Sequence, residues 1–213
     1  MHNTSKNPRY QDYVIRDGKL VGEFEEMYRD FDDPWEQSSH EPAALDKTIG
    51  LALLQKYGHQ RALEYGCGFG HFTAQLQHGL GAAAGVDISQ TAIDKARVRF
   101  PDATFFVGDI NDAAWIRDFA PDALIFAEIS WYVLAGLNEF KKLIMKHCEG
   151  GGFLHILTVY PEGQQQYGKD YFTNLEEIRA YWSDAVDVLE WGWVARGVDG
   201  TMRTFFYGTI RSR

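Results

Sequence analysis

The sequence predicts an α/β fold: a seven-stranded, mostly parallel β-sheet with helices on both faces and a C-terminal antiparallel hairpin. From residue 61 onward, short apolar runs alternate with helical patterns of about 10–15 residues, which indicates βαβ units. Two of the runs, 122–129 and 153–160, show little polar alternation, as expected of strands covered on both faces. The last two runs, 186–195 and 203–211, flank a turn with glycine and aspartate, which indicates a hairpin.

The chain of 213 residues is long enough for one domain with a buried core, and no repeat, low-complexity tract or linker divides it. We therefore expect a single domain over 1–213, with a helical substrate cover in 1–58 and a core in 60–213. Within the cover, a lid is expected from about residue 20 to residue 47.

Two helices are predicted in the cover. Apolar residues at helical spacing predict the first over 20–31, which Asp33-Pro34 ends. Ser38-x-x-Glu41 has the pattern of a capping box, and the second helix is expected to run from there to Gly58.

The core elements follow in order. Pro101 ends one helix, glycines at 150–152 end another, and Thr173-x-x-Glu176 suggests a capping box for a third. The predicted strands are 61–65, 82–89, 104–109, 122–129, 153–160, 186–195 and 203–211, and the predicted helices are 71–79, 90–100, 137–150 and 173–183.

Composition and charge exclude several classes of protein. A net charge of −9 repels phosphate backbones, so nucleic acid is a poor partner. No apolar run approaches the roughly 18 residues of a membrane span, and the polar N-terminus lacks the apolar core of a secretory signal. Cys67 and Cys148 form no disulfide framework or zinc motif and fit a reducing compartment. We expect a cytoplasmic protein without a metal, either a monomer or a homodimer.

The stretch LEYGCGFGHF, residues 63–72, places three alternating glycines at the first strand-to-helix turn of the core. Ligands of such sheets bind at the carboxyl ends of the strands, and glycine lets the backbone approach them closely. The dinucleotide pattern G-x-G-x-x-G fails because His71 stands at the third glycine position. Glu64 would also repel a diphosphate, whereas it would attract a ligand with cationic groups.

The pattern that stands, E-x-G-x-G-x-G, resembles motif I of class I S-adenosylmethionine-dependent methyltransferases, which have a Rossmann-like fold. The resemblance covers about 60–213 and implies that Asp87 holds the ribose hydroxyls. It also implies that Asp109 and its apolar neighbour hold the adenine, and that Glu128 lies near the methyl donor. The residues implied to bind S-adenosylmethionine, or its product S-adenosylhomocysteine, are Glu64, Gly66, Gly68, Gly70, Asp87, Ile88, Asp109, Ile110 and Glu128.

The N-terminal stretch also resembles the nodulation-type N-methyltransferases, which carry a D-P-W…S-x-Y-E…K run before motif I and methylate an amine on a chitin-like oligosaccharide. The positions that match in kind are Asp33-Pro34-Trp35, Ser38, Ser39, Glu41 and Lys47, with His40 where that group tends to have Tyr.

Methyl transfer needs positioning more than acid–base catalysis, and no motif names a general base. Strand ends and the lid suggest Glu128, His40 and Tyr132 as catalytic candidates. Trp35, Trp131 and Tyr160 are the substrate-binding candidates, because aromatic faces bind cations and pack on sugar rings. Trp191 and Trp193 are further pocket candidates, although filling gaps in the core or a dimer surface explains them equally well.

The sequence thus predicts methyl transfer to nitrogen or oxygen of a small polar molecule, an amine or a sugar. The fourth strand ends in AEISWY instead of an N/D-P-P-Y/F sequence, which disfavours methylation of nucleobases. A cofactor-binding scaffold without activity is the alternative, and a dinucleotide oxidoreductase is disfavoured by His71 and Glu64. The acceptor and the atom methylated stay open.

Overall fold

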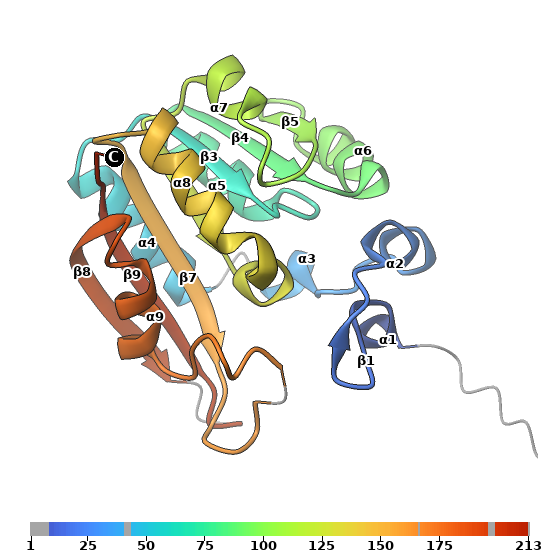
Figure 1. Ribbon diagram of the computed structural model, residues 1–213. Coiled ribbons are helices and arrows are strands. Elements are labelled where there is room, and N and C mark those ends of the chain that lie inside the picture. Colours follow the sequence, from blue (N-terminus) through green and yellow to red (C-terminus); the bar gives the residue numbers. More distant parts are fainter. Residues whose placement is uncertain (1–8, 41–43, 166, 196–198, 213) are drawn as a thin grey trace, which may run out of the picture.

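A computed structural model (Figure 1) describes residues 9–40, 44–165, 167–195 and 199–212. Its central sheet has the strand order β5-β4-β3-β6-β7-β9-β8, in which the first five strands are parallel and β9 runs antiparallel to both β7 and β8. The predicted fold class is confirmed. The strands are β3 (Arg61–Tyr65), β4 (Ala82–Asp87), β5 (Thr104–Val107), β6 (Ala123–Ala127), β7 (Gly152–Val159), β8 (Val186–Ala195) and β9 (Met202–Ile210).

Helices cover both faces of this sheet, as Figure 1 shows. On one face, Leu54 of α4 (Leu45–Lys56) and Phe72 of α5 (His71–Leu80) pack against strand residues, and α6 (Gln90–Arg99) lies beside β5. On the other face, Phe140 of α8 (Leu137–His147) and Trp182 of α9 (Leu175–Trp182) share a core cluster with α7 (Ala114–Phe119). Alternate residues of each strand therefore face two separate apolar cores.

Three strands end two residues earlier than predicted, because their last predicted residues belong to the loops that turn away from the sheet. β4 ends at Asp87, β5 at Val107 and β6 at Ala127. α8 also ends early, at His147, before Gly150 with φ of +76°. The sequence did not predict α7 or the two 3₁₀ turns, Ser130–Tyr132 and Leu134–Gly136.

The N-terminal cover differs from the prediction at its start. It contains α1 (Tyr10–Val14), a small hairpin of β1 (Ile15–Arg16) and β2 (Lys19–Leu20), and α2 (Phe24–Asp30). The helix predicted over 20–31 begins only at Phe24, because the chain turns at Asp17 and Gly18, both with positive φ, and residues 19–20 pair with β1.

The single helix predicted from Ser38 to Gly58 is two helices, α3 (Gln37–His40) and α4. Ser38 is not an N-cap: the carboxylate of Asp33 accepts hydrogen bonds from the amides of Gln37 and Ser38, each at 2.9 Å, and so caps α3. Glu41, the other half of the predicted capping box, lies outside the described residues.

The cover is fastened to the core beside α6, where Figure 1 places α2. The Glu25 carboxylate of α2 accepts hydrogen bonds from the hydroxyls of Ser89 and Thr91 and from the Thr91 amide, at 2.6 to 3.1 Å. Lys95 of α6 donates to the backbone carbonyl of Tyr28 at 2.9 Å. These polar contacts lie beside an apolar cluster that includes Met27 and Phe69.

The cap of α9 also lies one residue later than predicted. Asn174 Oδ1 accepts from the Glu177 amide at 2.9 Å, and the Glu177 carboxylate accepts from the Thr173 amide at 2.6 Å. The capping pair is therefore Asn174 with Glu177, in place of Thr173 with Glu176.

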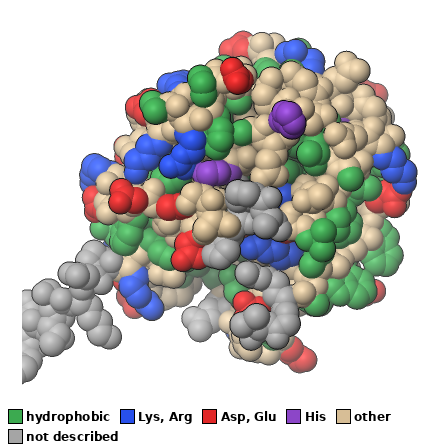
Figure 2. All heavy atoms as spheres, turned by 180° about the vertical axis from the view of Figure 1, so that it is seen from behind, with side chains coloured by type: hydrophobic (Ala, Val, Ile, Leu, Met, Phe, Trp, Pro, Cys, Tyr) green, Lys and Arg blue, Asp and Glu red, His purple; other side chains and the backbone are tan. Residues whose placement is uncertain are grey.

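The molecular surface shown in Figure 2, the face opposite to that of Figure 1, has acidic and basic side chains interspersed. On the edge strand β8, Trp191 and Trp193 are about half exposed, and the Arg179 guanidinium lies 4.2 Å from the Trp191 ring centroid. No helix among the described residues is long and apolar enough to cross a bilayer.

Candidate active site

A cavity of about 360 Å³ lies at the carboxyl ends of the parallel strands and is lined on one side by residues of the cover. Its lining follows the strand order across the sheet. The core contributes Gly108, Asp109 and Ile110 after β5, Val86, Asp87 and Ile88 at β4, Glu64 and Gly66 at β3, Ala127, Glu128 and Ile129 at β6, Thr158 of β7 and Arg203 of β9, with Tyr132 and Val133 nearby in the chain. The cover contributes Phe24, Tyr28, Trp35, Gln37, Ala44 and Lys47.

Glu64 is a buried acid on this lining. It lies on β3 with 3% of its surface exposed, and its Oε2 accepts a hydrogen bond from Thr73 Oγ1 at 2.5 Å. A buried carboxylate needs charged or hydrogen-bonding partners, so this position suits a ligand with a cationic group.

The three glycines have different roles, although all have positive φ. Gly66 lines the cavity, and a Cβ there would collide with the Ile129 side chain. A Cβ on Gly68 would lie 2.6 Å from Gln37 Oε1, and a Cβ on Gly70 would lie 2.5 Å from the Phe105 ring. Gly68 and Gly70 are not part of the lining; they allow the cover and β5 to pack against the loop.

Gln37 attaches the cover to this loop and was not predicted from the sequence. Its Oε1 accepts from the Phe69 amide at 2.9 Å, and its Nε2 donates to the Cys67 carbonyl at 3.4 Å. Beside it, Trp35 Nε1 donates to the Tyr28 hydroxyl at 2.9 Å. No local sequence signal marks Gln37, because its contacts are made 30 or more residues away.

Asp87 shapes the loop as well as the cavity. Its Oδ2 accepts from the Gly68 amide at 2.9 Å and its Oδ1 from the Ser89 amide at 3.0 Å. Burial raises the pKa of this carboxyl above its ordinary value, against the opposing effect of the hydrogen bonds. Both oxygens are therefore oriented before any ligand arrives.

Asp109 and Ile110 follow β5 and line the same end of the cavity. Asp109 Oδ1 accepts from the Asn111 amide at 2.8 Å, which fixes the turn, and Ile110 is buried. The ring of Trp115, on the helix α7 that the sequence did not predict, packs against Gly108. Ile88 lies at the rim with 59% of its surface exposed.

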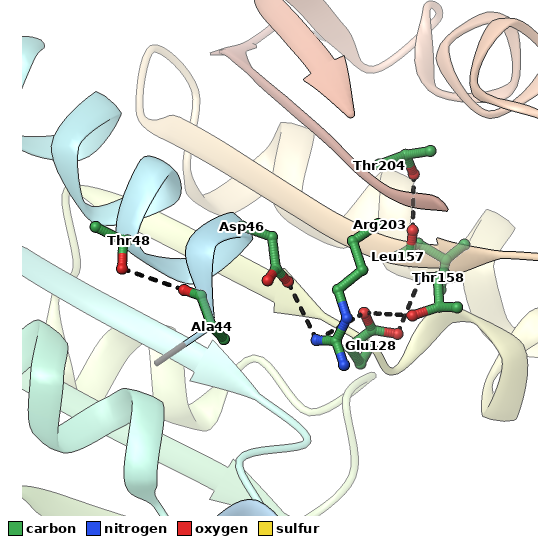
Figure 3. Close-up of polar contacts among 8 residues, drawn as sticks. All are labelled: Ala44, Asp46, Thr48, Glu128, Leu157, Thr158, Arg203 and Thr204. Atoms are coloured by element: carbon green, nitrogen blue, oxygen red, sulfur yellow. Dashed lines mark hydrogen bonds and ion pairs between the residues drawn. The ribbon is translucent and has the colours of Figure 1, made fainter. Parts of the chain in front are cut away.

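Glu128 has a left-handed backbone conformation, with φ of +61°, directly after β6. Its Oε2 accepts from the Thr158 amide at 3.0 Å and its Oε1 from the Thr158 hydroxyl at 2.9 Å. Figure 3 shows Arg203 between Glu128 and Asp46: its Nη1 lies 3.8 Å from Glu128 Oε1 and 3.3 Å from Asp46 Oδ2. Thr158, Arg203 and Asp46 were missed because three distant segments bring them together.

Aromatic side chains also line the cavity. The Tyr132 ring lies 5.5 Å from that of Trp35 and 5.7 Å from that of Phe24, between centroids. Burial raises the pKa of Tyr132 far above its ordinary value, so the phenol keeps its proton at neutral pH. The structure thus brings Trp35, Tyr132 and Glu128 to one cavity.

Other predicted site residues lie elsewhere. Trp131 does not line the cavity: it is 6% exposed, its ring packs against Phe172, and its Nε1 donates to the Thr158 carbonyl at 3.0 Å. Tyr160 is 44% exposed just beyond β7 and is not part of the lining. Trp191 and Trp193, on the edge strand, are not part of it either. The side chain of His40 lies outside the described part of the chain.

The chemical groups of the lining suit those of S-adenosylmethionine. Gly66 leaves the loop without a side chain at the lining, Glu64 offers a buried carboxylate to a cationic group, and Asp87 offers an oriented one to hydroxyls. Among the described residues, no group of three or more His, Cys, Asp or Glu side chains could hold a metal ion.

Comparison with known proteins agrees with this fit. Residues 62–152 match the model of a methyltransferase domain family. A trans-aconitate 2-methyltransferase of Afipia carboxidovorans is 33% identical over 103 residues, which are 47% of this chain and 40% of that protein. The match thus spans less than half the length of this curated relative.

Two solved structures have a similar fold. The N-methyltransferase NodS of Bradyrhizobium japonicum WM9, in complex with S-adenosyl-l-homocysteine, matches with a TM-score of 0.69 and 18% identity, over 87% of this chain and 97% of that one. The magnesium protoporphyrin IX methyltransferase of Synechocystis PCC 6803, with bound SAM, matches with a TM-score of 0.58 and 15% identity, over 95% and 90%. Residues 62–152 thus resemble a methyltransferase domain, and the fold of the chain is similar to that of these two methyltransferases.

Proposed function

We propose that this protein transfers the methyl group of S-adenosylmethionine to nitrogen or oxygen of a small polar molecule. The observation that supports this most is the continuous cavity along six strand ends, in which one half carries the donor-binding pattern and the other half remains for an acceptor. When bound, S-adenosylmethionine supplies an electrophilic methyl group on a sulfonium centre.

The donor half is assigned residue by residue. Glu64 and Gly66 would hold the methionine part, Asp87 the ribose hydroxyls, and Asp109 with Ile110 the adenine. Gly68 and Gly70 would act indirectly, by allowing the loop to adopt its conformation.

The cover would complete the site. Gln37 is hydrogen-bonded to the glycine loop and Trp35 lines the cavity, so the cover would exclude water from the place of transfer. Tyr132 and Glu128 face the acceptor half, while Trp131 and Tyr160 have no place on the described lining. Positioning two reactants in line accounts for a large part of the rate enhancement of such a reaction.

The names of the matched proteins support a small-molecule acceptor but differ in its kind. One relative is named for trans-aconitate and one structural neighbour for transfer to nitrogen. The acceptor is therefore best found by experiment.

The test is incubation with S-adenosylmethionine labelled in the methyl group and a panel of small amines, sugars, alcohols and carboxylic acids, with calorimetry of S-adenosylhomocysteine binding in parallel. We expect the product to bind at one site and label to appear on at least one acceptor class. Binding without any transfer would favour a non-catalytic scaffold, and absence of binding would contradict the proposal altogether.

A further inference from the structure

The edge strand β8 presents a surface that methyl transfer does not explain. It is ten residues long and last in the strand order, and in the described part of the chain no strand pairs with its outer side (Figure 1). The N–H and C=O groups that point outward from it are therefore available to another strand. β6, β7 and β9 separate it from the three strands that carry the donor assignments.

Aromatic side chains make this edge apolar on both faces. Trp191 and Trp193 are two residues apart and so share one face of the sheet, with 49% and 57% of their surfaces exposed. The Arg179 guanidinium of α9 lies over Trp191, so this is the face that α9 covers. On the other face, Tyr57 is 37% exposed and donates a hydrogen bond to Glu190 at 3.2 Å. Large exposed rings gathered along an open strand mark an interaction surface.

β8 lacks most of the features that keep strand edges from pairing. It contains no proline and no lysine, and it is longer than the short edge strands that resist pairing. The register with β9 shifts between Val188 and Glu190, which disturbs the first part of the edge. An added strand therefore has residues 190–195 available for regular pairing.

The charge of this edge favours a second copy of the same chain as its partner. A net charge of −9 opposes self-association over the surface as a whole. The two acids of β8, however, are paired with cations of their own chain: Lys56 contacts Glu190, and the Arg211 guanidinium donates to Asp187 at 2.8 Å. Arg179 adds a further cation beside the strand. Two copies can therefore approach through β8 without the repulsion that the net charge creates elsewhere.

The spacing of the two tryptophans is self-complementary. When two identical strands pair antiparallel about a twofold axis at Gly192, Trp191 lies directly opposite Trp193 of the partner subunit. The axis repeats this contact, so the pairing contains two cross-strand pairs of indole rings, with Cβ atoms about 5 Å apart in each. In this register, residues 190–194 of each copy pair with one another, which keeps the contact within the regular part of the edge.

We propose that this protein forms a homodimer in which β8 pairs antiparallel with β8 of a second copy, so that the two sheets become one continuous sheet. Trp191 and Trp193 lie at the centre of this interface and exclude water from it. The inference is independent of the proposed function, because β8 contributes no residue to the described lining of the cavity.

Light scattering of the purified protein across the micromolar range of concentration tests this, together with hydrogen exchange at both ends of that range. We expect the mass of two chains, and slower exchange of the β8 amides at the concentrations at which the dimer forms. Trp193→Ala should raise the dissociation constant of the dimer roughly 30-fold or more, because both symmetric contacts lose an indole ring. Its affinity for S-adenosylhomocysteine should stay the same, which shows that the variant is folded.

Val98→Ala is the matched control, since Val98 is an apolar residue of α6 with 86% of its surface exposed, and this variant should keep the wild-type dimer. The mass of one chain at every concentration of the wild type would overturn the inference, and so would an equally stable dimer in Trp193→Ala. A dimer whose β8 amides exchange at the same rate at both concentrations would also overturn it. This last measurement uses the wild type alone and decides the matter even if Trp193→Ala does not fold.

Discussion

Asp87 shows how one side chain can serve the fold and the site together. Its two oxygens hold the amides of Gly68 and Ser89, so the loop and the start of α6 keep their positions relative to β4. The same carboxylate lines the cavity, where each oxygen has a second lone pair for a ligand hydroxyl.

We expect Asp87→Ala to reduce the affinity for S-adenosylhomocysteine by about 100-fold or more, because two hydrogen bonds to a charged group are lost. Calorimetry measures this, with Asp102→Ala, at an exposed turn, as the control. Burial raises the pKa of Asp87, so this carboxyl gains its proton at a higher pH than an ordinary aspartate does. Binding of S-adenosylhomocysteine should therefore begin to weaken at that higher pH on acidification. Unchanged affinity in Asp87→Ala would mean that the ribose is misplaced in our assignment.

The group formed by Glu128, Thr158 and Arg203 was predicted from the sequence only in part. Glu128 was predicted because it ends a strand, and the positions of Glu64, Asp87 and Asp109 follow from the same rule. Arg203 depends on β9 being inserted between β7 and β8, which places the start of a strand 75 residues away beside Glu128. No local pattern encodes that contact.

At the scale of elements, hydrogen bonds attach α2 to the start of α6. Glu25 accepts three hydrogen bonds at the start of α6, and these bonds lower the pKa of its carboxyl, so the contact persists below the usual range of a glutamate. The ionised form is therefore the one that fastens the cover.

We expect Glu25→Ala to raise hydrogen exchange of the amides of α2 and to weaken binding of S-adenosylhomocysteine several-fold, while exchange in β3 stays the same. The physical reason is the loss of hydrogen bonds that together stabilise the docked cover by about 1–3 kcal/mol. Glu26→Ala, on the exposed side of the same helix, is the control. Equal exchange in both variants would show that apolar packing alone holds the cover.

The elements that the sequence predicted well are the ones with strong periodic signals. β3 was placed with its observed bounds because an apolar run ends at glycines, and α5 and α6 were placed within one residue. α7 was missed because six residues give too short a pattern, and α3 was joined to α4 because Asp33, four residues earlier than Gln37, supplies the cap. The boundary between α3 and α4 was wrong because a side chain that precedes α3 decides where this helix begins.

At the scale of the whole molecule, we expect His155 to make the free energy of unfolding depend on pH. It is fully buried on β7, its Nε2 lies 2.7 Å from Ser130 Oγ, and burial lowers its pKa from 6.5 to about 3. The unfolded chain therefore binds a proton between pH 6.5 and 3 that the folded protein excludes, so stability falls as the pH falls through this window.

We expect the contribution of His155 to the loss of unfolding free energy to be about 2 kcal/mol between pH 6.5 and 4.5. The His155→Phe variant need not be as stable as the wild type at neutral pH, because Ser130 loses its partner. Its free energy of unfolding should nevertheless fall less than that of the wild type between pH 6.5 and 4.5. Urea unfolding at each pH measures the slope, and His147→Phe, at an exposed site, should keep the wild-type slope. A wild-type slope in His155→Phe would show that other groups dominate acid unfolding.

The central claim is that the donor lies along the carboxyl ends of β3, β4 and β5, under the cover. Hydrogen exchange with and without S-adenosylhomocysteine tests it most directly. We predict slower exchange in residues 64–70, 87–91 and 108–111 and in α2, with β8 unchanged. Absence of any protection, or protection confined to the opposite ends of the strands or to the surface around His78 and Arg99, would contradict the claim.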